Sequence, residues 1–81
     1  MYVHIGGEYV VSTRLILGIF NMENIMRKQK DMIQFISGLE SCDMVEYVSN
    51  EIPRSIVFTV EKAYFSPIST ATLYKRMEYA G

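Results

Sequence analysis

The hydrophobic residues of this chain change their spacing twice, and this limits the fold more than any other feature. Over residues 2–20 they come in short runs separated by turn residues, which is typical of strands. Over residues 25–39 they recur every three or four positions, as on one face of a helix. Short runs return from residue 44. Strand-rich segments on both sides of a helix predict an α+β domain with a mostly antiparallel sheet.

Local signals set the expected boundaries of these elements. Gly6-Gly7 can form a tight hairpin turn, and Gly18 interrupts a long apolar run. That run is typical of a strand buried on both faces, with a bulge or a close backbone approach at the glycine. The order is βββ-α-βββ-α, with about five to six strands and two helices. We expect strands at 2–5, 8–12, 14–20, 44–48, 55–60 and 63–65, and helices at 24–38 and 70–79.

The ends of both helices carry capping signals. Asn21 or Asn24 can cap the first helix, and Gly38 is its expected end. Ser69 is a good cap for the last helix. A second register for the last helix, with Ser66 as the cap and Pro67 in the first turn, stays open.

The chain has few means of stabilising so small a fold. Its 81 residues fit one domain, spanning 1–81. Cys42 is the only cysteine and His4 the only histidine, so neither an intrachain disulfide nor a structural zinc site can form. Small proteins without such staples often associate. With 49% hydrophobic residues, we expect a homo-oligomer; a compact monomer with a rich core is the alternative.

The charge pattern argues against several classes of protein. The net charge is −1, so bulk electrostatics do not point to nucleic acid. The sequence shows no secretory signal and no apolar run near the roughly 20 residues of a membrane span. With a single cysteine, these features favour a cytoplasmic protein without a membrane partner.

The sequence gives little support to catalysis. His4 lies in the first predicted strand, and Cys42 has the acids Glu40 and Asp43 near it in the sequence and no basic residue that would activate its thiol. The remaining acids are scattered, as solvated surface residues are. We therefore expect no catalytic residues, no metal site and no cofactor.

Five cations are the candidate functional residues. Arg14 and Arg54 each stand at the entry to a strand, where a guanidinium held by a rigid backbone can bind phosphate with two hydrogen bonds. Arg27, Lys28 and Lys30 cluster on the first predicted helix. The alternative for each is a solvated surface charge. Because one copy offers few cations, an oligomer would be needed for tight DNA binding.

Four segments, in order, resemble the RemA/RemB family of bacterial extracellular matrix regulators, and the RemB branch most. They are Met1 to Val11, Ser12 to Arg14 with Gly18 to Phe20, Pro53 to Val57, and Tyr64 to Ser69 with Thr72-Leu73 and Lys75-Arg76. The resemblance implies a cytoplasmic regulator of biofilm matrix genes. In the RemA branch it implies a DNA-binding activator that forms rings and presents arginines to the duplex, and Arg14 matches one of these.

Two hypotheses follow for the function. The first is an oligomeric transcription regulator that binds the DNA backbone through Arg14 and Arg54, with help from the cations of the first helix. The second is a scaffold of the same fold that binds a protein partner and no DNA. Glu51, in the loop where the RemA branch carries several arginines, favours the second.

Overall fold

The computed structural model describes residues 1–28 and 30–80, without the side chains of residues 26–28, 30, 32, 79 and 80. Within these ranges the chain forms six strands, three α-helices and one 3₁₀ turn. They are β1 (Tyr2–Gly6), β2 (Tyr9–Ser12), the 3₁₀ turn η1 (Thr13–Leu15), β3 (Ile16–Asn21), α1 (Met22–Lys28), α2 (Lys30–Ser41), β4 (Val45–Tyr47), β5 (Ser55–Thr59), β6 (Ala63–Ser66) and α3 (Thr70–Ala80).

The strands of the described residues form two sheets. β1 and β2 make an antiparallel hairpin, and the other four strands lie in the order β3-β5-β6-β4. β3 with β5 and β5 with β6 are antiparallel, whereas β4 and β6 are parallel. This confirms the predicted α+β fold with a mostly antiparallel sheet. No helix among these residues is long and apolar enough to cross a membrane.

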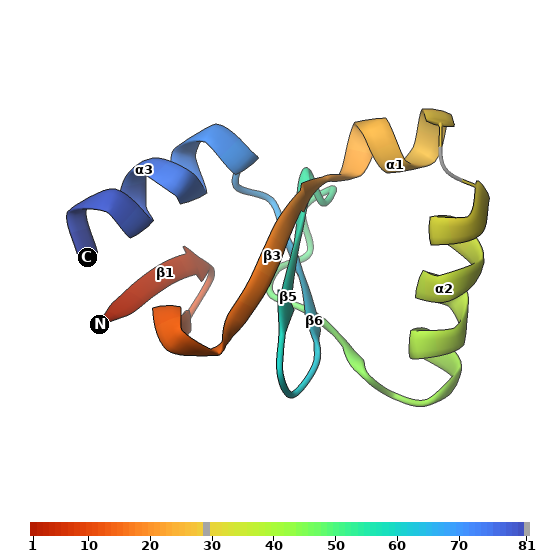
Figure 1. Cartoon of the computed structure of the whole chain (residues 1–81), viewed down its shortest axis with the longest axis horizontal. Helices are drawn as coiled ribbons and strands as arrows, with labels where there is room; N and C mark the ends of the chain where they lie inside the picture. The colour runs from red at the N-terminus through yellow and green to blue at the C-terminus, as the bar shows by residue number, and fades with distance from the viewer. Residues whose placement is uncertain (29, 81) are drawn as a thin grey trace.

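The four-stranded sheet separates two layers. In Figure 1, β3, β5 and β6 lie in the middle, with β1 and α3 on one side and α1 and α2 on the other. Successive residues of a strand face opposite sides of its sheet. Ile56 and Val57 of β5, both fully buried, therefore enter different clusters.

Each face of the sheet has its own hydrophobic cluster. The hairpin, α3 and one sheet face enclose the first, which contains Val3, Ile5, Val11, Ile19, Val48, Val57 and Leu73. The helices α1 and α2 cover the second, which contains Ile25, Ile36, Ile56, Ala63 and Phe65. The core is thus divided by the sheet.

The hairpin turn forms as predicted at Gly6-Gly7. Gly7 has a φ of 55°, in the left-handed region, and Gly6 has a φ of 123°. A Cβ atom on Gly7 would collide with the carbonyl oxygen of Val48. Only glycine fits this backbone and this close approach.

The third strand differs from its prediction in two ways. Residues 13–15 form η1, so β3 begins at Ile16 and not at Arg14. Among the described strands β3 pairs only with β5, at the edge of the sheet. It is not buried on both faces, because Leu17 is 71% and Phe20 42% exposed. The predicted irregularity at Gly18 is confirmed, because the register with β5 shifts between Ile16 and Gly18.

The first predicted helix is two segments, α1 and α2. Asn21 is the cap of α1, since its Oδ1 accepts a hydrogen bond from the Asn24 backbone N–H at 3.1 Å. Gly38 does not end α2, which continues to Ser41. The chain turns away at Asp43, which has a φ of 58°. The helix therefore ends at Ser41, three residues after the glycine, and the turn beyond it contains an aspartate in the left-handed region.

The last helix uses the first of its two predicted registers. Ser69 precedes α3, and its Oγ accepts a hydrogen bond from the Thr72 backbone N–H at 3.3 Å. Ser66 lies in β6 instead, where its buried hydroxyl donates to the carbonyl oxygen of Ile5 at 2.6 Å. That hydroxyl joins the sheet to the hairpin.

Candidate nucleic-acid interface

The backbone of Arg54 is fixed on both sides just before β5. Its N–H donates to the Ser66 carbonyl oxygen at 2.8 Å, and its carbonyl oxygen accepts from the Met22 N–H at 3.1 Å. The side chain is exposed, and it makes no hydrogen bond or ion pair with another described residue. A rigid backbone thus presents an available guanidinium.

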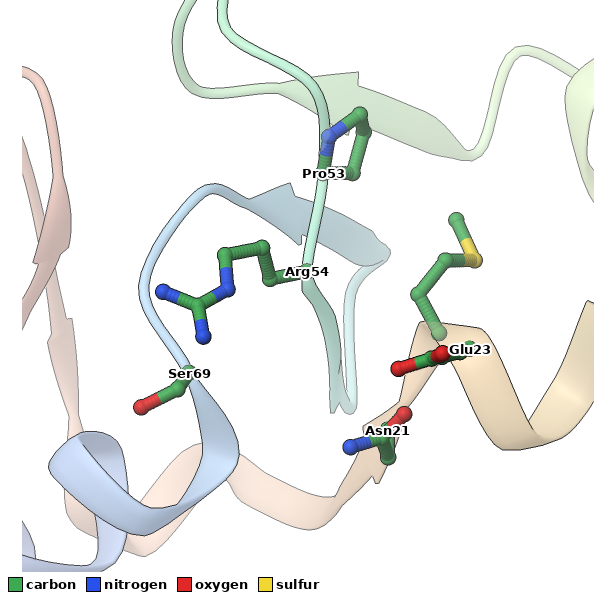
Figure 2. Close-up of a pocket in the computed structure, with 6 residues that line it drawn as sticks. Asn21, Glu23, Pro53, Arg54 and Ser69 are labelled. Atoms are coloured by element: carbon green, nitrogen blue, oxygen red, sulfur yellow. The ribbon is translucent and has the colours of Figure 1, made fainter.

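Arg54 lines a pocket of about 250 Å³ between the starts of two helices. Figure 2 shows its side chain extending toward Ser69 and the first turn of α3, with Asn21 and Glu23 on the side of α1. The amino-terminal end of a helix carries partial positive charge. Arg54 and the start of α3 therefore place two positive features together.

Arg14 lies within η1, before β3. Ser12 Oγ accepts from the Arg14 N–H at 3.4 Å, and the Thr13 N–H donates to the Met1 carbonyl oxygen at 3.0 Å. The Arg14 side chain is exposed and has no hydrogen-bond or ion-pair partner among the described residues. Its backbone is held less firmly than that of Arg54, because the bond to Ser12 is long.

The two arginines lie at opposite ends of one ladder and do not meet within the chain. In the antiparallel β3–β5 pair, Ile16 faces Thr59 and Asn21 faces Ser55. Arg14 precedes the first of these pairs and Arg54 adjoins the last. At about 3.3 Å per strand residue, they are separated by about 20 Å. The sequence predicted that each arginine precedes a strand. It did not show that the starts of these two strands lie at opposite ends of the β3–β5 pair.

The three helix cations lie on two helices and not on one. Arg27 and Lys28 fall within α1, and Lys30 starts α2. Their side chains lie outside the described residues. They stay a prediction of the sequence.

Two other cations are already engaged. The Lys62 ammonium lies 3.3 Å from Glu46 Oε1, and this hydrogen bond and charge raise the pKa of Lys62. Arg76 of α3 donates from Nη1 to the His4 carbonyl oxygen at 2.8 Å and lies 3.3 Å from His4 Nδ1. Nothing in the sequence indicated the Arg76–His4 contact, because 72 residues separate the partners.

Acidic residues accompany Arg54. Glu23 lines the same pocket, and Glu51 is exposed in the loop before β5. Carboxylates repel phosphate, so this end of the molecule is of mixed charge.

The sequence was compared with those of known proteins and protein families. The sequence model for RemA-like proteins, described as extracellular matrix regulatory protein A-like, matches residues 2–77. The chain belongs to the RemA-like family. It is 39% identical over 87 aligned residues to the extracellular matrix regulatory protein B of Bacillus subtilis strain 168, an alignment that covers 98% of this chain and 93% of that protein. The family is one of regulatory proteins and not of enzymes.

Of the potentially reactive side chains of this RemA-like chain, one bonds the backbone and the other faces solvent. His4 Nε2 lies 2.8 Å from the Gly7 carbonyl oxygen, inside the hairpin, and Cys42 is an exposed free thiol. In the part of the chain that the structure describes, no three His, Cys, Asp or Glu residues are grouped so that they could hold a metal ion.

Proposed function

We propose that this RemA-like chain regulates extracellular matrix genes by binding the DNA backbone as an assembly of several copies. Arg14 and Arg54 are the main contacts, and Arg27, Lys28 and Lys30 are further ones. The observation that carries this proposal is the exposed guanidinium of Arg54, which a fixed backbone holds beside the start of α3. A phosphate there would meet both a charge and a helix amino terminus.

Contacts of this kind position a protein on DNA and do not read its sequence. Arg14 and Arg54 stand just before β3 and β5, and neither lies on an α-helix that could enter the major groove. We therefore expect recognition led by the shape and charge of the duplex. Duplexes of equal length and different sequence should bind within about tenfold of one another.

Several copies are required because each supplies few phosphate contacts. Affinity for DNA and its salt dependence both increase with the number of phosphates neutralised. The net charge of −1 provides no general attraction. An assembly multiplies each arginine by the number of copies.

Fluorescence anisotropy of a labelled duplex at several salt concentrations tests the proposal. Arg14→Ala and Arg54→Ala should each weaken binding and flatten the plot of log affinity against log salt, by about 0.9 for each phosphate that is no longer neutralised. Lys62→Ala is the matched control, because Lys62 already pairs with Glu46. An intact assembly that binds no duplex at low salt, or two arginine variants that behave like the parent, would refute the proposal.

The second candidate is a scaffold that binds a protein partner. An apolar hollow lined by Leu17, Gly18, Phe20, Phe35 and Phe58 favours it, as do Glu23 and Glu51 beside Arg54. If the chain assembles but does not bind DNA, the result favours the scaffold that binds a protein partner.

A further inference from the structure

We propose that the contact between His4 and Arg76 is an acid-sensitive switch, which holds the hairpin of β1 and β2 against α3 while the His4 ring is neutral and releases it when the ring is protonated. The two residues lie 72 positions apart and meet only in the folded chain. Neither Arg14 nor Arg54 takes part in this contact, so the inference does not depend on the proposed function.

The contacts of the His4 ring fix the position of its hydrogen. Nε2 lies 2.8 Å from the carbonyl oxygen of Gly7, which can only accept a hydrogen bond, so Nε2 carries the hydrogen. In a neutral imidazole the other nitrogen, Nδ1, then offers a lone pair. Nη1 of Arg76 lies 3.3 Å from Nδ1, and a guanidinium can only donate. Both contacts of the ring are therefore satisfied in one form alone, the neutral ring with its hydrogen on Nε2.

Arg76 contacts β1 twice through one nitrogen. Besides facing Nδ1 of the ring, Nη1 donates to the backbone carbonyl oxygen of His4 at 2.8 Å. Each terminal nitrogen of a guanidinium carries two hydrogens, so both bonds can form together. The two bonds join the middle of β1 to the second half of α3.

Protonation of the ring breaks this arrangement. Once Nδ1 carries a hydrogen, it is a donor and can no longer accept the bond from Arg76. The ring and the guanidinium then both carry positive charge at a separation of 3.3 Å, and like charges repel. The bond from Nε2 to Gly7 survives, because Nε2 donates in both forms. Arg76 is therefore the partner that leaves, and mild acid is enough because an imidazole changes charge between about pH 5 and 8.

No carboxylate is bonded to the ring among the residues that the structure describes. Val10, the residue opposite His4 on β2, is uncharged. Glu8 in the turn and Glu78 on α3 are exposed, so solvent screens their effect on the ring. The other titratable groups on these elements are the Met1 amine, Tyr2, Tyr9, Tyr74, Lys75 and Tyr79, the last without a described side chain. Arg76 is thus the charged group that meets the ring directly.

The release is local, because Leu73 lies one turn before Arg76 and stays anchored. Leu73 is fully buried in the first cluster beside Val3 and Ile5, whereas the His4 ring lies at the surface. Acid therefore frees the part of α3 that follows Leu73 and the adjoining β1, while the sheet stays folded. Local openings of this kind cost less free energy than unfolding the whole domain. They give the chain a surface that is accessible only in acid.

Amide hydrogen exchange of the full chain at about pH 7.5 and about pH 5.5 tests the switch, since an imidazole changes charge between these values. Rates are compared as protection factors, which remove the pH dependence of the chemical exchange step. On acidification, protection in β1 and in α3 after Leu73 should fall by roughly three- to tenfold, as for the loss of about one hydrogen bond. Protection in β5 should change little. An unchanged β1, or an equal fall throughout the chain, would overturn the inference.

Two variants show whether the acid response belongs to this pair. His4→Gln cannot gain a charge, and Arg76→Ala has no guanidinium to release, so each should give the same protection in β1 at both pH values. Glu8→Gln is the matched control, because it removes the carboxylate nearest to His4 in the sequence and should keep the parental response. A response that persists in His4→Gln or Arg76→Ala, or that disappears in Glu8→Gln, would contradict the assignment.

Nitrogen NMR of the ring checks the tautomer without any substitution. His4 is the only histidine of the chain, so its ring signals are identified at once. At about pH 7.5 the hydrogen should reside on Nε2, and in acid both nitrogens should carry one. A neutral ring with its hydrogen on Nδ1 would overturn the inference, because Arg76 would then face a donor in both forms.

Discussion

The two faces of the four-stranded sheet are covered in different ways. On the face of β1, β2 and α3, the side chains of Ile5, Val57 and Leu73 are completely buried. On the face of α1 and α2, Ile56 and Phe65 are buried, but Phe20 and Phe35 stay largely exposed. Two hollows, of about 310 and 220 Å³, lie beside α2.

The difference shows where this small protein buries its side chains completely and where it leaves apolar surface accessible. Hydrogen bonds from Ser66 and Arg76 join the hairpin to the sheet and to α3, across 61 and 72 residues of sequence. These bonds close the first face. The second face keeps apolar area accessible, which is typical of an interaction surface. Substitutions on the two faces should therefore differ in their effects.

The largest effect is expected from Leu73→Ala. Leu73 is fully buried in the first cluster, and truncating such a leucine leaves a cavity that costs about 2–5 kcal/mol of unfolding free energy. Urea denaturation measures the loss. Leu17→Ala, at an exposed leucine beside the second face, should cost less than about 1 kcal/mol. Equal losses for the two variants would contradict the division.

Ser66→Ala should have the next largest effect. Its hydroxyl is buried and bonds the Ile5 carbonyl oxygen at 2.6 Å, while accepting from the Ile68 N–H at 3.0 Å. Leaving these groups without partners costs about 1–3 kcal/mol. Ser41→Ala is the control, since Ser41 makes an exposed bond to Ser37, and we expect a change within about 0.5 kcal/mol. A loss at Ser66 no greater than that at Ser41 would show that the hydroxyl does not stabilise the closed face.

Arg76→Ala should have a smaller effect, of about 1 kcal/mol, because its bond to the His4 carbonyl oxygen is partly open to solvent. Hydrogen exchange should also accelerate in β1. Lys75→Ala removes a neighbouring exposed cation and is the control. Unchanged exchange in β1 of the Arg76 variant would mean that this arginine does not hold the hairpin.

The smallest effect is expected at alkaline pH. Burial, followed by the hydrogen bond and charge of Glu46, raises the pKa of Tyr9 above 10.0. Burial and Glu40 raise the pKa of Tyr47 in the same way. A folded-state pKa above the unfolded value means that the stabilisation is complete below about pH 10 and is lost as the pH increases through the folded pKa.

Absorbance of tyrosinate during a pH titration checks this expectation. Tyr9→Phe and Tyr47→Phe should each remove a late-titrating component of the tyrosinate absorbance. If Tyr9→Phe leaves the late-titrating part of the curve unchanged, the surroundings inferred for Tyr9 are wrong.

The sequence predicted the elements that local signals determine. Gly6-Gly7 specifies its turn through backbone freedom, and Ser69 specifies the start of α3 through its hydroxyl. The exposure of β3 was not predictable in this way. A run of apolar residues does not show whether other elements cover both faces of a strand, and the partner strand β5 begins 39 residues after the start of β3. Gly38 misled the helix boundary, because it does not adopt the positive φ of a helix-ending glycine and α2 continues past it to Ser41.

The candidate site was predicted in part. Arg54 was identified from its position after a proline and before a strand. The pocket around it was not, since Asn21 and Ser69 come from distant parts of the chain and meet only through the sheet. The opposite placement of Arg14 and Arg54 follows from the antiparallel pairing of β3 and β5, which their spacing in sequence does not reveal.

The hydrogen bond between Ser66 and Ile5 also limits when the newly made chain can close its first face, because both partners must have been synthesised. A ribosome that adds about 5–20 residues per second needs roughly 3 to 12 seconds to cover the 61 residues between the two partners. Until Ser66 is made, the hairpin of β1 and β2 cannot bond to β6. β4 also cannot pair before then, because its neighbour β6 is synthesised later. During this interval the nascent chain exposes the apolar residues of the first cluster, so slow, non-local folding is a cost of this architecture.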